Sequence, residues 1–178
     1  NWTAQDFSDL DTIIQGYSEA ESWGFKDPRS LFMLEGWRHK LEGIQFIGTI
    51  RHPLAVAQSL HRRNPTLGDI NFFLELWNRY NLKLIEIWEE KNFPIIDFDQ
   101  PDEEYQKSIL ALIQKIGLRG SIWRCIREGD WKSVFLRLKP QSSSAFFDPA
   151  LRSTIYSDTS ALPPSIKKTY LRLKDIAG

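Results

Sequence analysis

The segment 44–50 (IQFIGTI) constrains the fold more than any other part of the sequence. Its residues are rich in β-branched and aromatic side chains and are almost continuously apolar, which is typical of a parallel strand covered on both faces. A second short strand is predicted at 93–98 (FPIIDF), and helical patterns separate the two. Strands that alternate with helices indicate βαβ units, so we expect a helix-rich α/β fold with a short parallel sheet.

The helices are predicted from apolar residues that recur at three- and four-residue steps and from capping residues. Phe73, Trp77, Leu84 and Ile87 give the clearest pattern, in a long helix from 69 to about 91. Further helices are predicted at 8–24, 29–41, 54–63, 102–116 and from 163 onwards, with a short strand at 23–26. We expect a single domain that covers 1–178.

The composition limits the kind of ligand that the chain binds. Of its 178 residues 42% are apolar, which suits a globular core, and 23 basic residues balance 23 acidic ones. A neutral chain has no long-range field that attracts nucleic acid or an anionic membrane. The single cysteine, Cys125, excludes an internal disulfide and a cysteine-rich metal site. Short apolar runs and the absence of a signal-peptide pattern lead us to expect a soluble, cytoplasmic protein without membrane insertion, which takes a small ligand.

Ligands of parallel sheets bind at the carboxyl ends of the strands. That rule selects the residues after each predicted strand, and Arg51 is one of them. It follows the predicted strand at 44–50 and precedes a helix whose first turn contains Pro53. Ser59 lies about one and a half turns into this helix. A guanidinium, a hydroxyl and a helix N-terminus together suit a phosphate group. In the alternative interpretation, Arg51 pairs with a carboxylate and Ser59 packs as a small helix residue.

The segment 51–60 (RHPLAVAQSL) is similar to the sulfotransferase segment that binds the 3′-phosphate of 3′-phosphoadenosine 5′-phosphosulfate (PAPS). In that family an arginine ends a strand and a serine follows eight residues later, as Arg51 and Ser59 do. The resemblance implies that both residues bind the 3′-phosphate of PAPS as a co-substrate. It also implies a P-loop-nucleotide-hydrolase-like fold with three α/β/α layers.

The segment 26–29 (KDPR) resembles the Lys-Asp-Pro sequence of bacterial and tyrosylprotein sulfotransferases. The resemblance implies a catalytic role for Lys26, whose ammonium would stabilise the charge on the departing phosphate oxygen. A solvated lysine in a turn is the alternative. Cytosolic sulfotransferases have a histidine two residues after this lysine as the base, whereas this chain has Pro28. No residue of the sequence is therefore assigned as the base.

Two further residues are implied only by the resemblance. Phe98, with Asp99 after it, resembles an aromatic–acidic pair whose aromatic ring stacks on adenine, and a core phenylalanine is the alternative. The segment 123–132 resembles a region that ends in Gly-Asp-Trp-Lys, and the resemblance places Arg124 on the 3′-phosphate. A surface arginine is the alternative there.

The family's loop for the 5′-phosphosulfate group has no counterpart in the sequence. We expect the first strand, this loop and a helix to precede Asn1, so that the chain as given transfers sulfate poorly. The predicted function is metal-independent sulfuryl transfer from PAPS to a hydroxyl or amine of a small-molecule, carbohydrate or lipid acceptor. The alternative is a non-catalytic nucleotide-binding or interaction module of the same fold, which uses its aromatic surface and the helix after 163 for contacts. A kinase ranks last, because it needs a glycine-rich loop.

Overall fold

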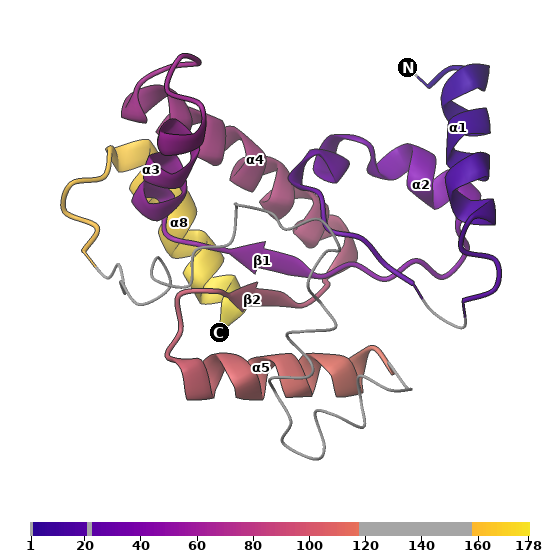
Figure 1. Ribbon diagram of the computed structural model, residues 1–178. Coiled ribbons are helices and arrows are strands. Elements are labelled where there is room, and N and C mark those ends of the chain that lie inside the picture. Colours follow the sequence, from indigo (N-terminus) through magenta and orange to yellow (C-terminus); the bar gives the residue numbers. More distant parts are fainter. Residues whose placement is uncertain (1, 21–22, 118–157) are drawn as a thin grey trace.

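The computed structural model describes residues 2–20, 23–117 and 158–178 (Figure 1). The described elements are α1 (Ala4–Gln15), the short 3-10 helix η1 (Pro28–Phe32), α2 (Leu34–Lys40), β1 (Gly48–Ile50), α3 (Pro53–Arg63), α4 (Ile70–Lys91), β2 (Ile95–Asp97), α5 (Asp102–Lys115) and α8 (Pro164–Ala177). In the described part, the chain is thus helix-rich, with one small sheet at its centre.

The sheet consists of β1 and β2, which are parallel and in register, with Gly48 opposite Ile95 and Ile50 opposite Asp97. The chain passes from β1 to β2 through α3 and α4. Both strands therefore end at the same edge, and the chain continues from there into α3 and towards α5. The expected α/β class with a parallel pair of strands is confirmed at this coarse level.

The core lies between the sheet and the helices α4 and α8. Ile166 and Leu173 of α8 are fully buried and pack in one cluster with Phe73 and Trp77 of α4 and with Ile50 of β1. Figure 1 shows α8 crossing behind the strand pair, next to α4. The helical periodicity of α4 and the buried face of α8 thus supply most of the hydrophobic contacts that fix β1 and β2.

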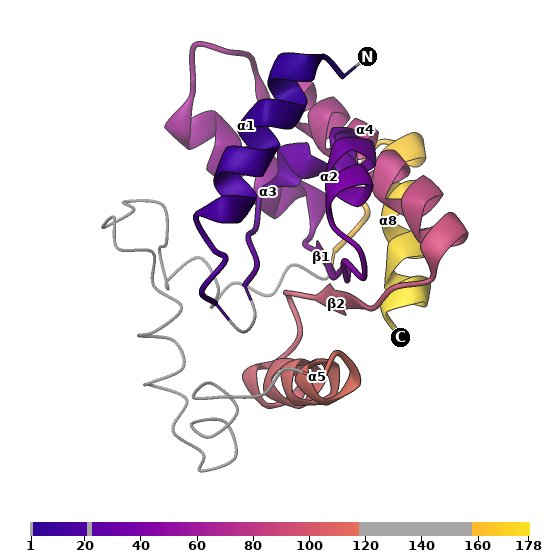
Figure 2. The ribbon, with the colours of Figure 1, turned by 90° about the vertical axis from the view of Figure 1, so that its right-hand side faces the viewer.

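Helices cover β2 from two directions. Ile95 belongs to the core cluster that contains Leu173 of α8, and both Ile95 and Ile96 line a small hollow with Leu112 of α5. Figures 1 and 2 both show α5 beyond β2, on the side away from β1. All three residues of β2 are buried, as expected of a covered parallel strand, but Thr49 of β1 is exposed. The expectation of cover on both faces therefore holds for β2 and is wrong for β1.

The predicted strand at 44–50 is shorter than expected, since only its last three residues pair with β2. The N–H of Gly48 donates to the carbonyl of Pro94 at 2.9 Å, and Pro94 has no N–H with which to extend the ladder. The strand predicted at 23–26 is wrong. Its aromatic side chains contact neighbouring rings instead: Trp23 stacks on Tyr17, and Phe25 packs against Trp37 at a tilt.

Two of the helices differ from the prediction, and local capping explains the earlier start of the first. Thr3 and Asp6 form a capping box, so α1 begins at Ala4, ahead of the Ser8 start that we expected, and it ends before Gly16. The helix predicted at 29–41 divides at Met33 into η1 and α2. The predictions for α3, α4, α5 and α8 are confirmed to within two residues.

Candidate functional site at the carboxyl edge of the sheet

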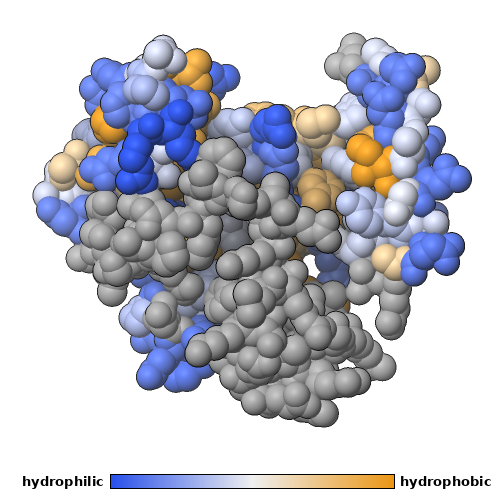
Figure 3. Space-filling model, viewed as in Figure 1, coloured by the Kyte–Doolittle hydropathy of each residue, from blue (hydrophilic) through white to orange (hydrophobic). Residues whose placement is uncertain are grey.

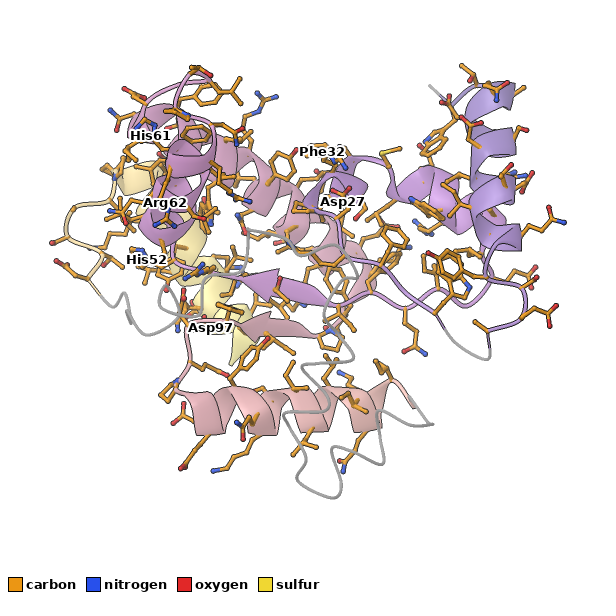
Figure 4. The ribbon with its side chains drawn as sticks, in the orientation of Figure 1. Asp27, Phe32, His52, His61, Arg62 and Asp97 are labelled. Atoms are coloured by element: carbon orange, nitrogen blue, oxygen red, sulfur yellow. The ribbon has the colours of Figure 1, made fainter. Side chains whose placement is uncertain are left out.

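The carboxyl ends of β1 and β2 bring two short polar segments together. Arg51 and His52 follow β1, and Phe98 and Asp99 follow Asp97, the last residue of β2. Figure 4 shows His52 and Asp97 near each other at this edge, below α3. The edge that sequence reasoning selected is therefore formed by side chains from both strands.

Asp99 connects the two strand ends. Its Oδ2 accepts a hydrogen bond from the backbone N–H of His52 at 2.5 Å, and its Oδ1 lies 3.3 Å from Nε of Arg51. The Asp99 side chain is 6% exposed and that of Arg51 is 23% exposed. A buried carboxylate that accepts from a backbone amide and a guanidinium holds both groups in fixed positions. The ion pair that the alternative interpretation of Arg51 expects is therefore present.

Phe98 lies directly beside this ion pair. The guanidinium carbon of Arg51 is 5.1 Å from the centroid of the Phe98 ring, a cation–π distance, and Tyr105 of α5 contacts the same ring edge-on. Phe98 is half-buried, so it belongs neither to the core nor to the open surface. The proposed stacking of Phe98 on adenine stays a prediction.

Asp97 is a second buried carboxylate at this edge. Its side chain is 2% exposed and forms an ion pair with Lys174 from the last turn of α8. The other carboxylate oxygen, Oδ1, accepts from the backbone N–H of Asp99 at 2.9 Å. Asp97 thus connects α8 to the loop that carries Phe98 and Asp99.

His52 is fully buried between the strand end and α8. Its Nδ1 accepts from the backbone N–H of Leu54 at 3.3 Å, which caps α3, and its ring contacts Tyr170 edge-on at 5.1 Å. Burial lowers the pKa of His52, against the opposing effect of a backbone hydrogen bond with Asp158 and of nearby carboxylates. Burial, followed by the charges of Asp97 and Asp99, raises the pKa of the Tyr170 hydroxyl. We therefore expect both rings to be neutral near pH 7.

Ser59 lies on α3, which begins two residues after Arg51. Its side chain is half-buried, and its backbone carbonyl accepts from Nε of Arg63 at 3.2 Å. Ser59 therefore comes from the helix whose N-terminus adjoins Arg51, as the sequence predicts. The 3′-phosphate role of both residues stays a prediction.

The segment that contains Lys26 is placed elsewhere. Asp27 caps η1 and pairs with Arg29 at 2.6 Å, and η1 packs on α4 through an edge-on contact between Phe32 and Tyr80. Figure 4 shows Asp27 well away from His52 and Asp97. Lys26 is exposed. The structure thus brings Arg51 and Phe98 together at one edge, with Ser59 on the adjoining helix, and leaves the segment of Lys26 at a distance from them.

An aromatic hollow of about 430 Å³ lies beside that segment. It is lined by Ile13, Tyr17, Trp23, Phe25, Asp27, Arg29, Ser30, Met33 and Trp37. Figure 3 shows hydrophobic surface over the neighbouring part of the molecule, around α1 and α2.

Some predicted residues lie outside the described ranges, and two residues of the site were not singled out from the sequence. Arg124, Cys125 and the segment 129–132 lie outside the described residues. Asp97 could have been suspected, because a carboxylate inside an apolar strand needs a partner. Lys174 had no comparable signal, since it is 77 residues further along the chain from Asp97.

Two other features are absent from the described residues. Within 2–20, 23–117 and 158–178, no three His, Cys, Asp or Glu side chains are grouped so that they could hold a metal ion. No helix in these ranges is long and apolar enough to cross a membrane.

In comparisons with known proteins, no family model, no curated protein and no solved structure matches the chain.

Proposed function

We propose that this chain binds PAPS at the carboxyl edge of β1 and β2 and transfers its sulfuryl group to an acceptor hydroxyl or amine. The observation that carries the proposal is the position of Arg51, which follows β1 directly and precedes the N-terminus of α3. A guanidinium beside a helix N-terminus at the exit of a parallel strand suits a phosphate dianion. Helices on two sides of β2 are consistent with the proposed P-loop-like α/β/α fold.

The proposed 3′-phosphate site combines charge with a fixed orientation. Asp99 accepts from Nε of Arg51 and so orients the guanidinium that would bind the phosphate. Ser59 would add a hydroxyl from α3, and Phe98 would offer a ring face to the adenine. A guanidinium that Asp99 already orients would lose less conformational freedom on binding a phosphate, which favours affinity.

The proposed reaction is an in-line transfer. An acceptor oxygen or nitrogen attacks sulfur, the bond between sulfur and the bridging phosphate oxygen breaks, and the acceptor proton passes to a base that is not yet assigned. Lys26 would stabilise the charge that develops on the bridging oxygen. Because its segment lies away from Arg51, this role is a separate proposal, which the Lys26→Met variant tests through turnover at unchanged bisphosphate affinity.

The second candidate function is a nucleotide-binding module without transfer activity. The distance between the Lys26 segment and the Arg51 edge favours it, since an enzyme needs both on the same nucleotide. Sulfate transfer to any acceptor, abolished by Lys26→Met, would exclude this candidate.

The decisive experiment is calorimetric titration with adenosine 3′,5′-bisphosphate, with 5′-AMP as the comparison ligand. We expect tighter binding of the bisphosphate, and a loss of about 10- to 100-fold in Arg51→Ala, because a hydrogen bond to a charged group contributes about 1.5–3 kcal/mol. Arg172→Ala is the matched control, since Arg172 is an exposed arginine that pairs with Glu89 on the surface. Equal affinity for both nucleotides in the native chain would contradict the proposal.

Arg51→Ala leaves the buried Asp99 carboxylate without its cation, so that variant could lose stability. The double variant Arg51→Ala/Asp99→Asn removes both charges and keeps an oxygen that accepts from His52. If the folded double variant still prefers the bisphosphate as strongly as the native chain, Arg51 does not bind the 3′-phosphate.

A further inference from the structure

The last turn of α8 supplies a cation to the candidate site. Lys174 forms an ion pair with Asp97, and Asp97 in turn accepts from the backbone N–H of Asp99. Asp99 accepts from the backbone of His52 and pairs with Arg51. A continuous series of polar contacts therefore runs from the C-terminal helix, through the end of β2, to the arginine at the end of β1.

Two buried carboxylates lie side by side in this series. Asp97 is 2% exposed and Asp99 is 6% exposed, and they are separated by one residue. Buried like charges repel each other and are costly unless each has a cation. Lys174 forms the ion pair with Asp97, and Arg51 forms the ion pair with Asp99. Without Lys174, the Asp97 carboxylate would compete with Asp99 for the Arg51 guanidinium.

The same helix also fixes the edge by packing. Tyr170, one turn before Lys174, contacts the ring of His52 edge-on and lies near Trp77. The indole N–H of Trp77 donates to the backbone carbonyl of Arg51 at 3.2 Å. One face of α8 therefore contacts the His52 ring next to Arg51 and, through Lys174, the Asp97 carboxylate.

We propose that Lys174 is a positioning residue for the 3′-phosphate site. By neutralising Asp97, Lys174 keeps the Arg51 guanidinium paired with Asp99 and oriented towards the phosphate. This inference rests on the proposed function, because it assigns Lys174 to the same site. Lys174 does not touch the phosphate in this arrangement. It neutralises Asp97, so that Asp99 keeps its orientation and Arg51 stays at the end of β1.

The test compares four variants by titration with adenosine 3′,5′-bisphosphate. Lys174→Met should weaken binding by roughly 3- to 30-fold, the range expected for residues that act on a site through others. Lys174→Arg keeps the charge and should bind like the native chain. In Asp97→Asn/Lys174→Met the uncompensated charge is gone, so affinity should recover. Lys168→Met is the matched control, because Lys168 is an exposed lysine on the same helix.

A second measurement reports on the contacts without any nucleotide. The backbone N–H of His52 and the Nε–H of Arg51 both donate to Asp99, so their proton resonances in NMR spectra report on its orientation. Lys174→Met should shift both resonances in the folded protein, and Asp97→Asn/Lys174→Met should return them towards the native positions. A loss of stability alone would not produce this recovery.

The two measurements separate the inference from the proposed function. If the native chain does not bind the bisphosphate, the proposed function fails, and with it the phosphate role of Lys174. The NMR shifts then decide whether Lys174 still positions Arg51. Unchanged resonances in Lys174→Met, or an affinity equal to that of Lys168→Met, would overturn the inference even where the bisphosphate binds tightly.

Discussion

Nε of Arg51 lies 3.3 Å from Oδ1 of Asp99, so the cation at the end of β1 is held by the carboxylate after β2. This contact joins two segments that are 48 residues apart in the sequence. It gives Asp99 a structural role in the ligand-free chain and, under the proposed function, a role in orienting the phosphate-binding group. The two roles can be measured separately.

Asp99→Ala should destabilise the fold by about 1–3 kcal/mol, because the N–H of His52 and the guanidinium of Arg51 lose a buried acceptor. Asp99→Asn should cost less, since its amide oxygen can still accept from His52. Urea unfolding of both variants measures the difference. Asp175→Ala, which removes an exposed aspartate of α8, is the control and should change stability little. Equal losses in Asp99→Ala and Asp175→Ala would contradict the role of Asp99.

Leu173→Ala should lower the free energy of unfolding by about 2–5 kcal/mol, since Leu173 is fully buried against β1, β2 and α4. Leu171→Ala on the same helix should change it by no more than about 0.5 kcal/mol, because Leu171 is 46% exposed. Thermal unfolding of the pair provides the comparison. Similar losses in both would mean that α8 does not pack on the sheet through this face.

The sequence predicted the parts of the fold that local patterns determine. The recurrence of Phe73, Trp77, Leu84 and Ile87 located α4, and the apolar run before Arg51 located β1 and its exit. The candidate edge follows from those elements, because parallel strands direct their carboxyl ends the same way. Arg51 could therefore be placed without a structure.

Contacts between distant segments could not be predicted in this way. The charged positions of α8 indicated a surface helix suited to partners, whereas Ile166, Tyr170 and Leu173 bury one face of it. One of its charged residues, Lys174, pairs with a buried carboxylate of β2, which the sequence did not indicate. At 23–26 a short strand was predicted, but Trp23 stacks on Tyr17 and Phe25 packs against Trp37 at a tilt, and the segment forms no strand.

His52 should make the stability depend on pH below neutrality. Burial lowers its pKa in the folded state below the ordinary value of 6.5, so the unfolded chain binds the proton more readily. The stabilising contribution is therefore complete above about pH 6.5 and is lost as the pH falls below it, by at most about 1.4 kcal/mol per pH unit. Urea unfolding between pH 5 and 8 measures this slope.

His52→Asn is the matched variant for the pH experiment. Asparagine is a favourable N-cap and its side-chain oxygen can replace Nδ1 as the acceptor for the N–H of Leu54, but it does not titrate. The slope between pH 5 and 6.5 should become shallower in this variant. The same slope in both proteins would assign the pH dependence to other groups.

Thr169 and Asn78 form a buried hydrogen bond between α8 and α4, with the hydroxyl of Thr169 donating to Oδ1 of Asn78 at 2.7 Å. Thr169→Val should cost about 1–3 kcal/mol, because it leaves the Asn78 amide buried without this donor. In Asn78→Leu/Thr169→Val both polar groups are gone, so the double variant should lose less than the sum of the single variants. Urea unfolding of the four proteins gives the coupling, and strictly additive losses would show that the two side chains do not interact.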